Sequence, residues 1–107
     1  MEDLASRECV PCRGGVPPMQ SVEIEKFLDA LDGWEVVKEH HLRKAYTFKN
    51  FRDALTFVNR VGELAEDVGH HPDIAFGWGH AALTIWTHTI DGLTESDFIL
   101  AAKIDAL

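Results

Sequence analysis

The sequence predicts a two-layer α+β domain, in which a four-stranded antiparallel sheet carries helices on one face. Three segments repeat hydrophobic residues at helical spacing, and four shorter segments alternate apolar with polar residues as strands do. Along the chain they follow the order helix, strand, strand, helix, strand, strand, helix. A chain of 107 residues has the length of one domain. We therefore divide it into a flexible N-terminal arm, residues 1–20, and a folded domain, residues 21–107.

The arm contains a lone Cys-x-x-Cys, formed by Cys9 and Cys12 among prolines and glycines. A redox motif of this spacing normally opens a helix after a strand, and a zinc site would need two further ligands. The surrounding Pro and Gly residues favour an irregular tail with reduced thiols. A half-site that another chain completes is the alternative.

Charge and hydropathy exclude two classes of partner. The net charge is −8, and the ten basic residues are scattered, whereas nucleic-acid binding relies on clustered Lys and Arg. No apolar run approaches the roughly 20 residues of a membrane helix, and the first residues lack the basic and apolar regions of a signal peptide. We expect a cytoplasmic protein that binds neither nucleic acid nor membranes.

The first two helices have clear boundaries. Residues 21–31 carry an apolar stripe, with Ser21 as the N-cap and Asp32-Gly33 as the stop. Residues 51–68 keep a 3.6-residue period after Asn50, whose position suits an N-cap with an acidic residue three places on. Gly69 then ends this longer helix.

Two strands are predicted between these helices, at residues 34–38 and 42–48, where aromatic and β-branched residues gather. The connection between them contains His40 and His41. We interpret this histidine pair as part of a polar turn without a functional role.

A hairpin is predicted from the period-two pattern of residues 73–78 and 81–88. A two-residue loop, Gly79-His80, suits a type II′ turn, and it would place Ile74 opposite Ile85. The same register sets His88 opposite His71 and Trp86 opposite Asp73, where paired Cβ atoms would lie roughly 5 Å apart. After the hairpin, a capping box from Thr94 to Asp97 opens the last helix.

Three histidines are the candidate acid–base groups: His70, His71 and His88. An imidazole suits general acid–base catalysis because its ordinary pKa, about 6.5, lies close to neutral pH. Glu66 precedes His70 by four residues, a helical spacing that would let the carboxylate orient this imidazole. One histidine alone is more often a satisfied polar residue, but three that converge favour a site. A zinc site built from the three histidines is the alternative.

The pattern resembles the signature of the pterin-4a-carbinolamine dehydratases. The resemblance covers residues 21–107 and includes Gly33-Trp34 and the run from Phe48 to Phe51. Its core is the order Glu66-x-x-x-His70-His71-Pro72, then Trp78, His88 and Asp97.

The resemblance implies an enzyme that dehydrates 4a-hydroxytetrahydropterin to quinonoid dihydropterin, without a metal or cofactor. It implies a homodimer or homotetramer that serves the tetrahydropterin cycle of an aromatic amino-acid hydroxylase. His71 and His88 would flank the reacting atoms, with His70 held by Glu66. Supporting or substrate-binding positions would be Glu66, Pro72, Asp73, Trp78, Trp86 and Asp97.

A binding protein is the alternative from another class. Relatives of this fold also act without catalysis, as dimerisation partners of a transcription factor or as assembly factors of a carboxylating enzyme. Some of those relatives depart from the histidine signature, whereas this sequence retains every position of it. The retained signature favours catalysis.

Overall fold

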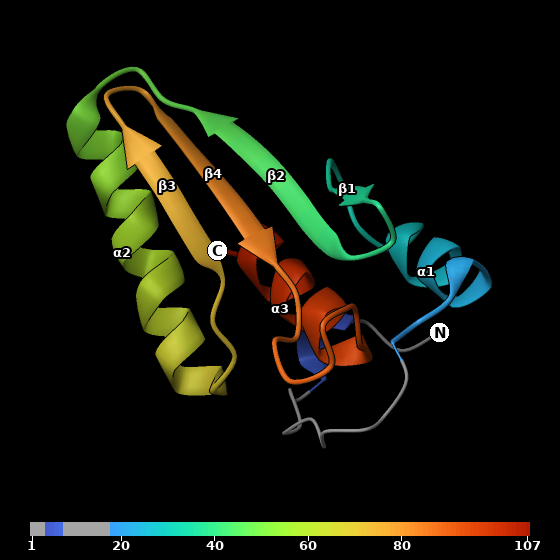
Figure 1. The fold of residues 1–107 in the computed structure, drawn as a ribbon. Coiled ribbons are helices and arrows are strands. Elements are labelled where there is room, and N and C mark those ends of the chain that lie inside the picture. The colour runs from blue at the N-terminus through green and yellow to red at the C-terminus, as the bar shows by residue number, and fades with distance from the viewer. Residues whose placement is uncertain (1–3, 8–17) are drawn as a thin grey trace.

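A computed structural model describes residues 4–7 and 18–107 of the chain and confirms the predicted fold class. The sheet is antiparallel throughout, with its strands in the order β1-β2-β4-β3 (Figure 1). Along the chain, the three α-helices and four strands occur in the predicted order. The elements are η1 Leu4–Ser6, α1 Ser21–Leu28, β1 Glu35–Val37, β2 His41–Thr47, α2 Phe51–Val68, β3 Asp73–Gly77, β4 His80–Ile85 and α3 Glu95–Asp105.

The core lies between one face of the sheet and the helices. Leu42 of β2 and Leu83 of β4 are fully buried on that face, where they join Val61 of α2 and Phe98 of α3. The next position along β2, Arg43, is exposed, as the period of two in a strand requires. The sheet therefore has one packed face and one open face.

The caps of the two longer helices match the sequence. Asn50 Oδ1 accepts a hydrogen bond of 2.8 Å from the backbone N–H of Asp53. Gly69 ends α2 with a φ of +72°, and its N–H bonds to the carbonyl of Ala65 at 2.9 Å. The φ value lies in the left-handed region that glycine adopts most readily.

Helix α1 differs from the prediction at both ends. It stops at Leu28 instead of Leu31, because the chain then tightens into turns in which Ala30 and Leu31 bond three residues back. Ser21 is the first helical residue and not the N-cap, since its hydroxyl bonds to Glu39. The preceding Gln20 occupies the cap position without a side-chain bond to the helix.

Part of the predicted arm packs against α3. Leu4 of the short helix η1 is buried in the core, and the ammonium of Lys103 donates a 2.9 Å hydrogen bond to the carbonyl of Ala5. The sequence pattern gave no sign of this contact. Cys9 and Cys12 lie outside the described residues.

The predicted register of the β3–β4 hairpin is wrong by two residues. Ile74 pairs with Leu83 instead of Ile85, and Gly77 pairs with His80. The loop is therefore Trp78-Gly79, with the positive φ of +77° at the second loop position. A shift of two residues leaves every side chain on its original face, so the alternation pattern could not reveal the error.

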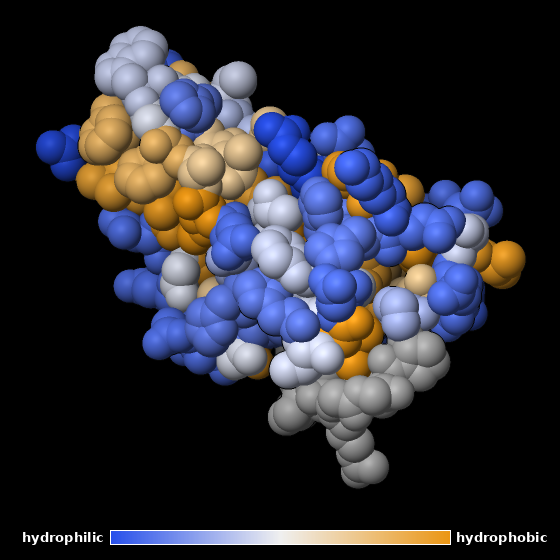
Figure 2. Space-filling view, viewed as in Figure 1, coloured by the Kyte–Doolittle hydropathy of each residue, from blue (hydrophilic) through white to orange (hydrophobic). Residues whose placement is uncertain are grey.

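Hydrophobic side chains gather at the surface where α2 begins and the hairpin turns (Figure 2). Phe51 and Phe76 are both exposed there, with ring centroids 5.7 Å apart. Across residues 4–7 and 18–107, no helix combines the length and apolar composition that a membrane span requires.

Candidate active site

The left-handed turn at Gly69 sends the two neighbouring histidines to different carboxylates. His70 Nε2 donates to Asp97 Oδ1 at 2.6 Å, and His71 Nε2 donates to Glu66 Oε2 at 2.5 Å. The prediction that Glu66 holds His70 is therefore wrong. Helical spacing does not continue past Gly69, because its φ of +72° ends the helix before His70.

Asp97 is the buried centre of the site, with no exposed surface. Besides the imidazole of His70, its carboxylate accepts the hydroxyl of Thr87 at 2.9 Å and the backbone N–H of Thr94 at 2.8 Å. The bond from Thr94 belongs to the capping box of α3, which is confirmed. A buried carboxylate needs such donors, since an unpaired charge in the interior is strongly destabilised. Asp97 thus ties the start of α3 to His70 and to the segment after β4.

The second carboxylate pair is open to solvent. The side chains of His71 and Glu66 are 58% and 78% exposed, whereas those of His70 and Asp97 are 16% and 0% exposed. Water screens an exposed pair, so Glu66 orients His71 more weakly than Asp97 orients His70. Within the described part of the chain, Nδ1 of each of these two rings has no hydrogen-bond partner. Both atoms remain available to exchange a proton.

The predicted pairing of His88 with His71 is wrong, as is that of Trp86 with Asp73. Asp73 pairs with Thr84, and the ladder of β4 ends at Ile85. His88 instead stacks on Trp86, with ring centroids 4.3 Å apart and 28° between the planes. Thr87, which lies between Trp86 and His88 in the sequence, donates its hydroxyl to Asp97. His88 therefore joins the site through its neighbours, and no bond to His70 or His71 is found among residues 18–107.

The other predicted positions fall into two groups. Pro72 and Asp73 lie beside His71, where the chain enters β3. Trp78 lies in the loop between β3 and β4, with 70% of its surface exposed. Figure 1 shows this loop at the opposite end of β3 from the segment that follows α2. Six residues lie between His71 and Trp78, and seven steps of about 3.3 Å per residue along extended chain give a span of roughly 23 Å. Within one chain, Trp78 does not join the histidines.

Sequence reasoning missed three residues that contact the site. Thr87 is buried and binds Asp97. The rings of His40 and His41 lie against Trp86, with their centroids 5.5 Å and 6.1 Å from that of the indole, respectively. The interpretation of the two histidines as a polar turn alone is therefore incomplete. The pairing of Leu42 with Ile85 brings them there, and this pairing joins strands that are far apart in the sequence.

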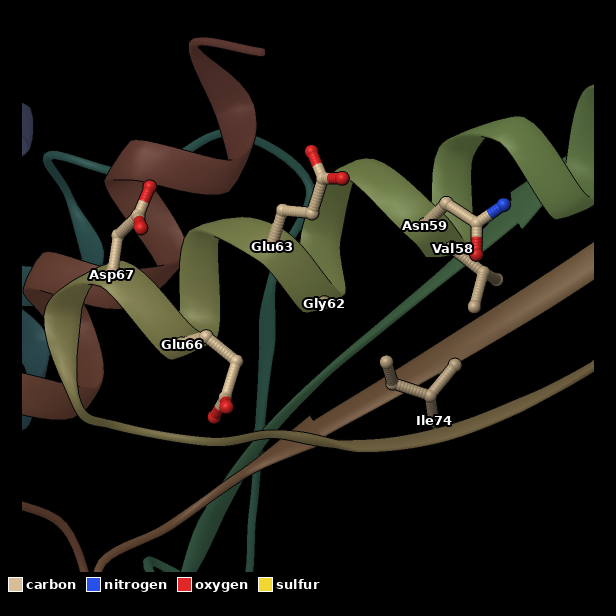
Figure 3. Close-up of a pocket in the computed structure, with 7 residues that line it drawn as sticks. All are labelled: Val58, Asn59, Gly62, Glu63, Glu66, Asp67 and Ile74. Carbon is tan, nitrogen blue, oxygen red and sulfur yellow. The ribbon is translucent and has the colours of Figure 1, made fainter.

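An open groove of about 590 Å³ runs beside the site, between α2 and β3. Figure 3 shows the carboxylate of Glu66 directed toward the segment that leads into β3, while Glu63 and Asp67 point away from it. Residues that line the groove are Val58, Asn59, Gly62, Glu63, Glu66, Asp67 and Ile74. It shares only Glu66 with the histidine cluster. The pair formed by His71 and Glu66 therefore lies at the edge of this groove.

The described residues contain no group of three His, Cys, Asp or Glu side chains arranged to hold a metal ion. The site instead has two imidazoles on adjacent residues, His70 and His71, each paired with a carboxylate. Such pairs fix the tautomer of each imidazole, which suits proton transfer.

Comparison with known proteins identifies relatives over nearly the whole chain. The family model for pterin 4 alpha carbinolamine dehydratase matches residues 17–107. A protein of Rubrobacter xylanophilus is 64% identical over 107 residues, covering 100% of both chains. One of Alkaliphilus metalliredigens is 48% identical over 106 residues, covering 98% of this chain and 96% of the relative. Both are named "Putative pterin-4-alpha-carbinolamine dehydratase".

Two solved structures share the fold. A transcriptional coactivator/pterin dehydratase from Brucella melitensis has a TM-score of 0.78 at 31% identity, covering 83% of this chain and 96% of its own. A pterin dehydratase-like protein described as a RuBisCO assembly factor of the α-carboxysome has a TM-score of 0.60 at 26% identity. That match covers 70% of this chain and 88% of the other.

Proposed function

This chain belongs to the pterin-4-alpha-carbinolamine dehydratase family, and on that basis we propose that it dehydrates 4a-hydroxytetrahydropterin by histidine acid–base catalysis. The observation that carries the proposal is the pair of adjacent imidazoles, each bonded to a carboxylate through Nε2. Each ring keeps its Nδ1 for a substrate.

The reaction needs one acid and one base. As the C4a–O bond breaks, the departing hydroxyl takes a proton and leaves as water. The N5–H proton goes to a base, and its bonding electrons form the N5=C4a double bond of quinonoid dihydropterin. A positioned imidazole contributes about 10² to 10⁴ in rate to each such transfer. We assign these two transfers to His71 and His88, while His70, held by Asp97, presents its Nδ1 as a hydrogen-bond acceptor to the substrate.

The proposal extends to the setting of the reaction. The proton transfers balance without a redox step or a metal, so we propose an enzyme that needs no cofactor. Its substrate would come from an aromatic amino-acid hydroxylase in the cytoplasm. We also propose a homo-oligomer, since the exposed rings of Phe51 and Phe76 offer an apolar surface. Sedimentation of the purified protein tests that point.

Stopped-flow absorbance of 4a-hydroxytetrahydropterin decay tests the catalytic proposal. The wild type should accelerate the reaction over its spontaneous rate, and His71→Ala and His88→Ala should each lose most of that acceleration. His80→Ala is the matched control, because this exposed histidine lies at the hairpin turn, away from the cluster. Full turnover by both site variants would refute the assignment, and zinc in stoichiometric amount would favour the metal alternative.

A binding role is the second candidate function. The coactivator and assembly-factor descriptions of the two structural relatives favour it, together with the exposed aromatic surface at the hairpin end. A folded wild-type protein without dehydratase activity, but with a partner that co-purifies in stoichiometric amount, would support this role.

A further inference from the structure

The connection between β1 and β2 reaches the loop that follows His88. His40 Nε2 donates to Asp91 Oδ1 at 2.8 Å, and the ring of His40 lies 5.5 Å from that of Trp86. Asp91 belongs to the same tight turn as His88, since its N–H bonds to the carbonyls of Thr87 at 2.9 Å and His88 at 3.2 Å. We call His40, His41 and Asp91 the histidine brace.

The brace has defined proton positions. His40 Nδ1 and His41 Nδ1 are 3.0 Å apart, so one of them donates while the other accepts, and a proton on both would clash. Burial, His40 and Lys38 lower the pKa of His41, which favours its neutral form. The carboxylate of Asp91 fixes the proton of His40 on Nε2. Only one proton is then shared between the two rings.

The orientation of the His88 side chain depends on contacts with other residues. Its side chain is exposed, and an exposed side chain samples several rotamers unless a contact selects one. The contact found for it is the stack on Trp86, at 4.3 Å and 28°. Trp86 is in turn flanked by the rings of the brace, and Asp91 connects the brace to the backbone of His88.

We propose that His40 and Asp91 are positioning residues for His88, fixing through Trp86 and the turn the orientation from which this imidazole transfers a proton. The inference rests on the proposed dehydratase function and adds to it a support from the β1–β2 connection. The side chains of His40 and Asp91 are 34% and 88% exposed, so their bond adds little to global stability. We expect loss of this bond to slow the dehydration reaction instead.

Asp91→Asn is the sharpest variant. Asp91 has a φ of +55°, and asparagine tolerates this left-handed conformation, so the turn is preserved while the charge is removed. We expect kcat to fall about fivefold with KM nearly unchanged, equivalent to about 1 kcal/mol of transition-state stabilisation. His40→Ala should have a similar or larger effect, and His40→Gln, which retains a donor for Asp91, should recover part of the rate.

A second readout does not depend on activity. The indole ring current displaces the Cε1–H signal of His88 in a ¹H–¹³C spectrum, and His88→Ala identifies that signal. In Asp91→Asn and His40→Ala it should move toward the value of the exposed His80, whereas His80→Ala should leave it unchanged.

Both readouts together decide the inference. A slower reaction with a displaced His88 signal supports it. An unchanged His88 signal overturns it, whatever happens to the rate. If the His88 signal moves in the variants but the wild type does not dehydrate the pterin, the proposed function is refuted. The role of the brace in catalysis is then refuted as well.

Discussion

Replacing Asp97 by asparagine tests the centre of the site most directly. Asparagine has the size of aspartate but only one acceptor oxygen. If that oxygen takes the place of Oδ2, it keeps the hydroxyl of Thr87 and the N–H of Thr94. The amide NH₂ then faces His70 Nε2 at the former 2.6 Å contact, where two donors cannot both remain. His70 must move its proton to Nδ1.

The magnitude follows from the bonds that change. A hydrogen bond to a charged group contributes about 1.5–3 kcal/mol, and one such bond is lost and partly replaced. We expect the free energy of unfolding to fall by about 2 kcal/mol, which lowers Tm by roughly 10 °C in a domain of this size. The proton on Nδ1 turns an acceptor of the site into a donor, so kcat should fall about 100-fold. Asp97→Ala, which removes all three bonds, should destabilise by more, about 3–5 kcal/mol.

Urea unfolding and stopped-flow dehydration measure the two effects. His70→Ala completes a double-mutant cycle, and the unfolding free energies of the single and double variants should reveal a coupling of about 1–3 kcal/mol between the two residues. Additive losses, or an Asp97→Asn variant with the rate and Tm of the wild type, would refute the reasoning.

Three further predictions concern the rest of the fold. The lowered pKa of His41 means that the unfolded chain binds its proton first, so stability should fall as the pH drops below about 6.5; His41→Gln should flatten this part of a Tm-versus-pH curve, and an unaltered curve would contradict the assignment. Leu83→Ala, at a site with no exposed surface, should lower the free energy of urea unfolding by about 2–5 kcal/mol because it leaves a cavity. Lys38 has a φ of +53°, so Lys38→Gly should relieve backbone strain and raise the free energy of unfolding by about 1 kcal/mol. A variant less stable than the wild type would mean that the lysine side chain contributes more stability than the relief of strain provides.

Local signals in the sequence were enough for the two longer helices and for the order of helices and strands in the folded domain. Asn50 and Gly69 mark both ends of α2, and the capping box at Thr94 marks the start of α3, because caps depend on residues within one turn of each other. The alternation of apolar and polar residues identified which face of each strand is buried. The identities of the candidate histidines also came from local order.

The partners of those histidines came from the tertiary structure. The register of β3 on β4 was wrong by two residues because such a shift preserves both faces, and only the position of Gly79 in the loop decides between the alternatives. The sequence assigned Glu66 to His70, whereas the chain direction after Gly69 gives His70 to Asp97 and His71 to Glu66.

The contact of His40 and His41 with Trp86 depends on the pairing of β2 with β4. More than forty residues separate these side chains along the chain, and no local pattern specifies that pairing. The sequence by itself determined which residues can carry the chemistry. The folded chain decided which of them meet, because cross-strand neighbours and buried hydrogen-bond partners are set by contacts between distant segments.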